Sequence, residues 1–241
     1  MPPAKRYSDF SELSMPIERI IQGLTEFQDN YFSTHQEFFQ LLSLKQAPEV
    51  LLITCSDSRI DPNLLTQTKP GELFVIRNIG NMIPPHGTLN SSEGAGIEYA
   101  VAALNIKHII ICGHSHCGSM KALLQLNKLN EDMPLVYDWL KHHGEPIRRL
   151  LKENHKDCDE AELLRIAIEE NVLTQIENLK TYPVIHLSLG RKPPATQGEE
   201  CLLRSILALD IFLKSFNSYT ATTCYKITRC PKNFFAPVIL L

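Results

Sequence analysis

Apolar residues first recur with a helical period and then occur in short continuous runs. From Pro16 onward the apolar positions are Ile17, Ile20, Ile21, Leu24, Phe27 and Tyr31. This spacing places one apolar stripe along a helix. A second amphipathic stretch covers residues 34–44. The pattern therefore predicts an N-terminal helical arm over residues 16–45, preceded by a flexible segment over residues 1–15.

The next part of the chain alternates buried strands with helices. Residues 50–55, 73–77 and 108–112 are short apolar runs, which is typical of strands covered on both faces. The intervening pattern predicts helices over 92–104 and 118–126, and a further helix extends to about Lys180 after the start signal formed by Asp159 and Glu162. The alternation predicts an α/β fold with a mainly parallel central sheet flanked by helices.

Composition changes along the chain although its average is ordinary. The 241 residues carry a net charge of -3 and are 44% hydrophobic, which argues against global disorder and against a strongly basic nucleic-acid binder. Residues 190–241 contain seven basic and three acidic residues, a net +4, so the first 189 carry -7. Three of the seven cysteines also lie in this part. A shift in charge sign and cysteine density at one point indicates a boundary near residue 190.

Neither a membrane span nor a secretory signal is visible in the sequence. No stretch reaches about 18 consecutive apolar residues, and the N-terminus lacks an apolar signal-peptide core. We therefore expect the protein to stay inside the cell that makes it. In a reducing compartment, cysteines near histidines indicate metal ligands or catalytic thiols before disulfides.

Two predicted strand ends carry the candidate chemistry. Cys55 is followed by Asp57 and Arg59, and the third strand leads into His114, His116 and Cys117. The carboxyl ends of parallel strands meet at one edge of a sheet, so these residues can converge. Two thiolates and one imidazole suit zinc, and three protein ligands leave a fourth position open for a water that loses a proton near neutral pH.

Several readings of these residues stay open on sequence alone. A guanidinium keeps a neighbouring carboxylate ionised, so Asp57 paired with Arg59 would orient zinc-bound hydroxide, or Asp57 would itself fill the fourth zinc position. The same pair also fits a plain structural ion pair. His116 is a rival ligand to His114 or a solvent-facing loop residue. Cys112 lies in mid-strand and is expected in the core.

Together with their flanking sequences, the two motifs resemble the β-class carbonic anhydrases. The resemblance rests on Cys55-x-Asp57-x-Arg59, His114-x-x-Cys117 and the surrounding segments of residues 53–85 and 93–118. It covers about residues 16–186 and is strongest to the cyanobacterial carboxysomal branch. It implies one Zn²⁺ per chain held by Cys55, His114 and Cys117, with Asp57 and Arg59 as the catalytic dyad. The implied substrate pocket contains Gln46, Phe74, Ile79 and Tyr99.

The resemblance also implies an activity and partners. The implied reaction is the reversible hydration of carbon dioxide to bicarbonate by zinc-bound hydroxide, with His86 and Tyr99 as candidate proton shuttles. The implied assembly is a homodimer or a larger assembly of dimers. The implied location is the cytoplasm and its carboxysome, in a carbon dioxide concentrating mechanism with shell-organising proteins as partners. Alternatives are a carbon disulfide or carbonyl sulfide hydrolase on the same fold and an inactive, zinc-containing carboxysome assembly module.

The resemblance divides the chain into a main α/β domain over 16–186, which includes the helical arm, and a divergent tail over 187–241, because the family pattern stops after about His186. The family's next strand is not recognisable there, so the third strand is expected to become an exposed apolar edge. An amphipathic helix over 202–216 is one reading of the tail, and a translational frameshift is another.

Overall fold

The structure, a computed structural model, describes residues 16–88, 90–155 and 158–190 and three strand segments beyond them. It divides into two units, Met1–Gln46 and Ala47–Leu241. In the first unit, helix α1 (Pro16–Glu26) continues through the π-helix η1 (Phe27–Phe32), and helix α2 (Gln36–Leu44) follows. The helical prediction for the N-terminal arm is confirmed.

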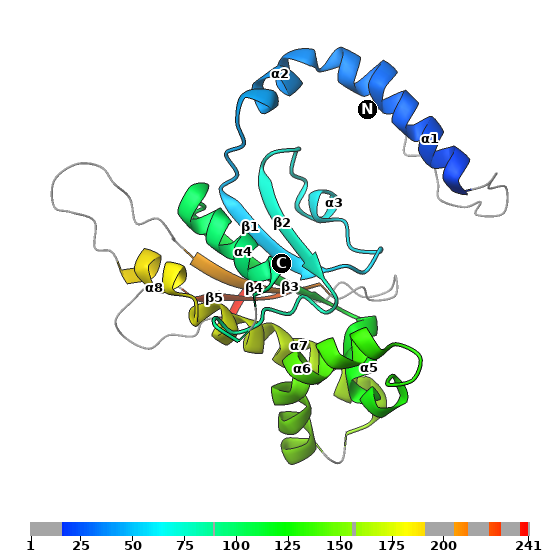
Figure 1. Cartoon of the computed structure of the whole chain (residues 1–241), viewed down its shortest axis with the longest axis vertical. Helices are drawn as coiled ribbons and strands as arrows, with labels where there is room; N and C mark the ends of the chain where they lie inside the picture. The colour runs from blue at the N-terminus through cyan, green and yellow to red at the C-terminus, as the bar shows by residue number, and fades with distance from the viewer. Residues whose placement is uncertain are drawn as a thin grey trace. The chain divides into compact units, whose positions relative to one another are not determined.

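The second unit contains the predicted parallel sheet. Strand β1 (Val50–Cys55) pairs in parallel with β2 (Leu73–Asn78) on one side and with β3 (His108–His114) on the other. In this register the last residue of β1, Cys55, lies opposite Asn78 of β2. Figure 1 shows the three strands side by side, ending toward the same edge. Both predicted ligand motifs are therefore delivered to that edge by adjacent strands.

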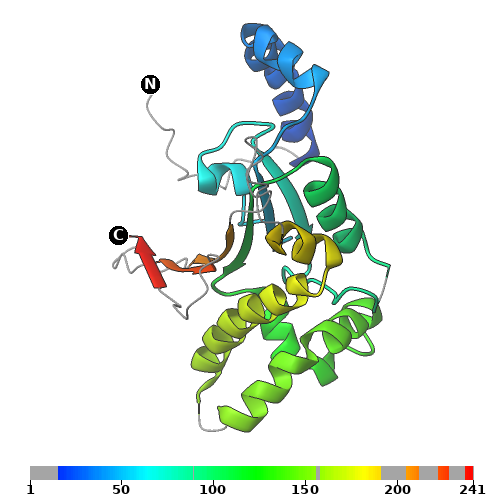
Figure 2. The same cartoon turned by 90° about the vertical axis from the view of Figure 1, so that its left-hand side faces the viewer.

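Helices cover both faces of these strands and gather at their carboxyl end. Figures 1 and 2 show α3 (Pro62–Thr66) and α4 (Ser92–Glu98) on opposite sides, and α4 continues into the π-helix η2 (Tyr99–Ala103). Near the carboxyl edge lie α5 (Gly118–Leu124), the 3-10 turn η3 (Leu126–Lys128), α6 (Pro134–Asn154) and α7 (Glu160–Lys180). The Asp159 side chain accepts a hydrogen bond from the Glu162 N–H at 2.8 Å, so the predicted helix start is confirmed as an N-cap.

Two clusters of buried side chains form the core of this unit. One joins β1 and β3 to α4, η2 and the last turns of α7, with Leu51, Ile53 and Ile109 completely buried. The other joins the carboxyl edge of the sheet to α5, α6 and the first half of α7, and it includes Cys55 and Cys117. The cysteines of the two motifs thus lie against a packed apolar layer. None of the helices within the described ranges has the length and apolarity needed to cross a membrane.

The tail contradicts two expectations. Strand β4 (Ser205–Ile211) pairs in parallel with all seven residues of β3, so β3 is not an exposed edge. Strands β5 (Thr222–Ile227) and β6 (Pro237–Leu240) extend the sheet antiparallel, in the order β2-β1-β3-β4-β5-β6. The helix predicted over 202–216 is therefore wrong for 205–211, because backbone pairing with an open strand edge competes with helical periodicity. Helix α8 (Pro183–Gly190) continues without a break across position 186, where the sequence resemblance was expected to end.

Candidate metal centre

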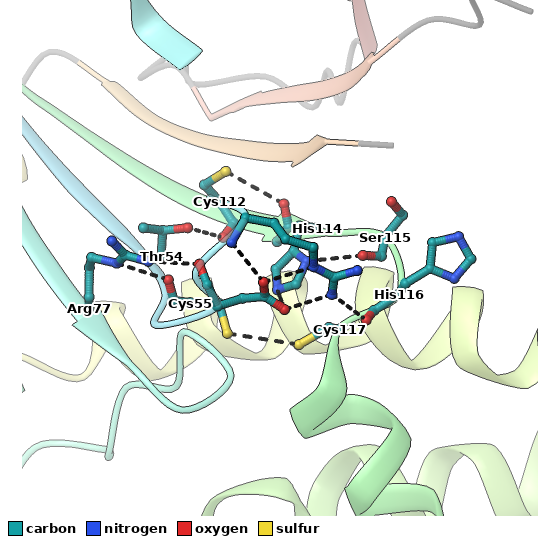
Figure 3. A network of polar contacts seen from close by, with 11 residues as sticks. Thr54, Cys55, Arg77, Cys112, His114, Ser115, His116 and Cys117 are labelled. Carbon is teal, nitrogen blue, oxygen red and sulfur yellow. Dashed lines mark hydrogen bonds and ion pairs between the residues drawn. The ribbon is translucent and has the colours of Figure 1, made fainter. Parts of the chain in front are cut away.

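Cys55, His114 and Cys117 form one compact group of ligand atoms. Their ligating atoms all lie within 4.8 Å of one another, and the two cysteine sulfurs are 4.0 Å apart. All three side chains are at most 3% exposed. Figure 3 shows the two sulfurs facing each other beside the His114 ring. The geometry follows from topology, since Cys55 ends β1, His114 ends β3 and Cys117 immediately precedes α5.

His114 has one nitrogen engaged and one without a partner. Its Nδ1 lies 3.0 Å from the Ser115 carbonyl oxygen, to which it donates. Its Nε2 is buried and has no hydrogen-bond partner among the described residues. A buried polar atom without a partner is costly, on the order of 1–3 kcal/mol. A metal ion bonded to Nε2 would remove that cost, so the three residues fit zinc both in ligand type and in the lone pair they present.

The two cysteine sulfurs shift each other's pKa in opposite directions. The hydrogen bond between them lowers the pKa of Cys55 against the opposing effect of burial, and His114 and the backbone of Asp57 contribute in the same direction. The same hydrogen bond, together with burial, raises the pKa of Cys117. Burial lowers the pKa of His114, but the nearby Cys55 sulfur, the Ser115 carbonyl and the Asp57 charge together outweigh it, and the net shift is upward. The shared hydrogen bond therefore favours ionisation of Cys55 over ionisation of Cys117.

Asp57 and Arg59 form a bidentate ion pair beside this group. Arg59 Nε and Nη2 donate to the two Asp57 carboxylate oxygens at 2.9 and 2.7 Å, and the Arg59 backbone N–H adds a bond at 3.0 Å. These hydrogen bonds hold the pKa of Asp57 well below its usual range. Asp57 Oδ2 lies 3.8 Å from His114 Nε2, which is too far for a hydrogen bond. An ionised carboxylate is thus held next to the unpartnered nitrogen.

Two arginines tie the loops of the site together, one of which the sequence analysis missed. Arg77, near the end of β2, donates to the backbone carbonyls of Cys55 (3.1 Å) and Asp57 (2.8 Å). Arg59 Nη2 also donates to the His116 carbonyl at 3.0 Å, which joins the two ligand loops. The sequence feature that could have identified Arg77 is its position near the carboxyl end of β2, the third parallel strand at this edge.

The rival ligand His116 and the core residue Cys112 both lie outside the triad. His116 is exposed and has a left-handed backbone with φ of 54°, and Figure 3 shows its ring pointing away from the sulfurs. Cys112 is buried within β3, as expected for a core residue.

The predicted pocket residues occupy different environments. Phe74 of β2 is half-buried and its ring centroid lies 6.0 Å from that of Tyr99, whose side chain is exposed. Ile79 follows β2, and its carbonyl accepts a hydrogen bond from Trp139 Nε1 at 2.8 Å. Gln46 is the last residue of the first unit, so its place in the pocket stays a prediction. His86 is exposed, with its ring 5.3 Å from that of Tyr182.

Comparisons with known proteins agree with this site. Residues 50–197 match the protein family described as carbonic anhydrase, which extends beyond the limit near residue 186 expected from the sequence. The chain is 57% identical to a carbonic anhydrase of Synechococcus elongatus over 72% of its own length, and 55% identical to one of Synechocystis over 76%. The alignments cover 63% and 66% of those two proteins, slightly less than two thirds of each.

A solved structure shares both the fold and much of the sequence. The β-carbonic anhydrase CcaA superposes with a TM-score of 0.76 at 44% identity, and the match covers 91% of this chain and 93% of that one.

Proposed function

The chain belongs to the β class of the carbonic anhydrase family, and from this premise we propose that it catalyses the reversible hydration of carbon dioxide to bicarbonate. The observation that carries the proposal is the buried triad of Cys55, His114 and Cys117, with His114 Nε2 unpartnered and an ionised carboxylate 3.8 Å away. The triad would hold one Zn²⁺. When bound, zinc supplies the Lewis acidity that makes a water molecule nucleophilic near neutral pH.

The residues of the chain have separate tasks in this reaction. Arg59 keeps Asp57 ionised and fixes the direction of its carboxylate. Asp57 accepts a hydrogen bond from the attacking water, which directs the oxygen lone pair toward the carbon of the substrate. The reaction releases bicarbonate and one proton, for which His86 and Tyr99 are the candidate carriers. Phe74, Ile79, Tyr99 and Gln46 form the proposed substrate pocket, in which the Gln46 amide donates to a substrate oxygen.

The ion pair argues against Asp57 as a fourth metal ligand. Both Asp57 carboxylate oxygens already accept hydrogen bonds from Arg59, and Arg77 holds the backbone carbonyl of the same residue. Turning the carboxylate onto a metal would break the bidentate pair. We therefore propose that Asp57 orients water and that the site stays open to substrate.

We further propose a dimer, or an assembly of dimers, located in the cytoplasm and its carboxysome and contributing to carbon dioxide concentration, with shell-organising proteins as partners. The apolar stripe of α1 supports an association surface, because Ile17, Ile20, Ile21 and Leu24 are each more than half exposed within their unit. The similarity to two cyanobacterial carbonic anhydrases supports the location.

The decisive experiment measures carbon dioxide hydration by the purified, zinc-loaded full chain. We expect stoichiometric zinc and activity in the wild type, and loss of both in Cys55→Ala. Cys158→Ala is the matched control, because Cys158 is a half-buried free cysteine outside the triad. Folded, zinc-loaded protein without hydration would refute the proposal and favour the assembly module. Activity restricted to carbon disulfide or carbonyl sulfide would favour the hydrolase.

A further inference from the structure

Five polar side chains on α7 and the turn after it bind the backbone of the loop between β2 and α4. We call them the α7 ladder: Asn171, Gln175, Asn178, Thr181 and Tyr182. The first four members recur at intervals of four, three and three residues, which places them on one side of the helix and its C-cap, and Tyr182 follows Thr181 directly. The loop they bind, residues 79–86, begins directly after β2 and ends before α4. It is distant in sequence from the ladder, so folding alone brings the two together.

The inner part of the ladder is completely buried. Asn171 Nδ2 donates to the Gly80 carbonyl at 2.9 Å, and Gln175 Nε2 donates to Asn171 Oδ1 at 2.9 Å. Gln175 Oε1 accepts the Ile83 N–H at 2.6 Å. The two amides are 1% and 0% exposed. Because a buried amide is costly unless it is paired, this pair stabilises one conformation of the loop.

The outer part of the ladder continues the same contacts toward the surface. Asn178 Nδ2 donates to the Ile83 carbonyl, and the Tyr182 hydroxyl donates to the Pro84 carbonyl, both at 2.8 Å. Thr181 Oγ1 accepts the His86 N–H at 2.8 Å. The ladder thus engages five backbone groups of the loop.

Gly80 connects this loop to the metal site. Its carbonyl is held by Asn171. Its backbone φ is +82°, and a Cβ there would lie 3.2 Å from both Met120 Cε and Ser119 Cβ of α5. Gly80 therefore packs against α5, the helix that begins directly after Cys117, at a position where only a glycine backbone fits without strain.

We propose that the α7 ladder is a positioning element of the metal site, which holds the 79–86 loop, and Gly80 with it, against α5, so that Cys117 at the start of that helix stays in place and zinc is retained. The proposal rests on the zinc site proposed above. Hydrogen-bond partners of metal ligands, and the groups that orient them, control how tightly a metal is held. An apolar helix face would have packed against the loop without fixing the direction of its carbonyl and N–H groups.

The release of zinc to an excess of a coloured chelator tests the ladder. Asn171→Leu removes the bond to the Gly80 carbonyl while keeping a similar volume, and we expect zinc release about 10- to 100-fold faster than in the wild type. Ile176→Ala is the control for general destabilisation, because Ile176 is a buried apolar residue of the same helix. We expect its zinc release to stay within about two-fold of the wild-type rate. Equal release rates in the two variants, or an unchanged rate in Asn171→Leu, would overturn the proposal.

Amide hydrogen exchange on the wild type provides a second measurement if Asn171→Leu does not fold. In zinc-free protein we expect the Ile83 and His86 amides to be protected, because ladder side chains hold both of them. Exchange of these amides at unprotected rates would overturn the idea that the ladder orders the loop. A wild type that binds no zinc would instead refute the proposed function, so the two failures are distinguishable.

Discussion

Replacing Gly144 with alanine is expected to force α5 and α6 apart. Gly144 is buried within α6, and an added Cβ would overlap Leu123 Cδ1 and lie 2.9 Å from Leu123 Cδ2. Real carbon atoms do not approach so closely, so Leu123 must move. Leu123 is 0% exposed and belongs to the cluster that contains both cysteine ligands. It therefore has no route into solvent and must displace its neighbours.

Two opposing effects determine how much Gly144→Ala changes the free energy of unfolding. Overpacking a close-packed core costs about 1–3 kcal/mol, and replacing glycine by alanine in a helix regains about 1 kcal/mol. Three atoms of Leu123 lie within 3.2 Å of the added Cβ, which supports the upper part of the first range. We expect a net loss of about 2 kcal/mol in the free energy of unfolding, or about 4–8 °C in Tm for a unit of this size.

Thermal and urea unfolding measure this loss, and two further variants locate its cause. Gly23→Ala places a Cβ in α1 with nothing within 4 Å, so it should not destabilise the protein. Leu123→Ala costs about 2–5 kcal/mol alone, but adding Gly144→Ala to it should cost nothing more, because the clashing atoms are gone. A Gly144→Ala variant as stable as the wild type would refute the packing argument, and so would a full additional loss in the double variant.

Three further predictions concern the site and the helix that supports it. The folded pKa of Asp57 is depressed, so its pair with Arg59 contributes stability above about pH 4 that is lost as the pH falls toward the folded pKa. The difference in urea stability between zinc-free wild type and Asp57→Asn should therefore shrink below about pH 4, and a constant difference would contradict this cause. Arg77→Lys cannot bridge the two carbonyls that Arg77 binds, so we expect zinc release to chelator about 10-fold faster. Arg165→Lys, whose partners are partly exposed glutamates of α7 away from the triad, should show the wild-type rate. Asp159→Ala removes the N-cap of α7 and should lower the free energy of unfolding by about 1 kcal/mol. Asp159→Asn keeps a side chain that can cap the helix, so it should retain most of the wild-type stability. Equal losses of the two variants in urea unfolding would exclude capping as the cause.

The regular part of the fold was predictable because local patterns produce it. The apolar runs ending at Cys55 and preceding His114 have the length of buried strands, and parallel strands must end at one edge. The convergence of two distant motifs follows from those two facts. The N-cap at Asp159 was predictable for the same reason, since it involves residues three positions apart.

The tail could not be predicted in this way. The pattern over 202–216 suggested an amphipathic helix, yet β4 lies within it. The deciding factor is the open edge of β3, whose backbone groups pair with β4 along the full length of β3. That partner is about 97 residues away and leaves no trace in local periodicity.

The α7 ladder was also invisible in the sequence. Asn171 and Gln175 interrupt the apolar face of α7 and look like solvent-facing residues, but both are buried. Their partners, Gly80 and Ile83, lie about 90 residues earlier in the chain.

The sequence by itself determined which kinds of ligand reach the edge of the sheet, because residue type and strand periodicity are local properties. Only the tertiary structure decided between His114 and His116, since that choice depends on which ring faces the two sulfurs. It alone decided that Arg59 and Arg77 join the ligand loops and that α7 holds Gly80. Those hydrogen bonds join distant parts of the chain, and packing brings them within bonding distance.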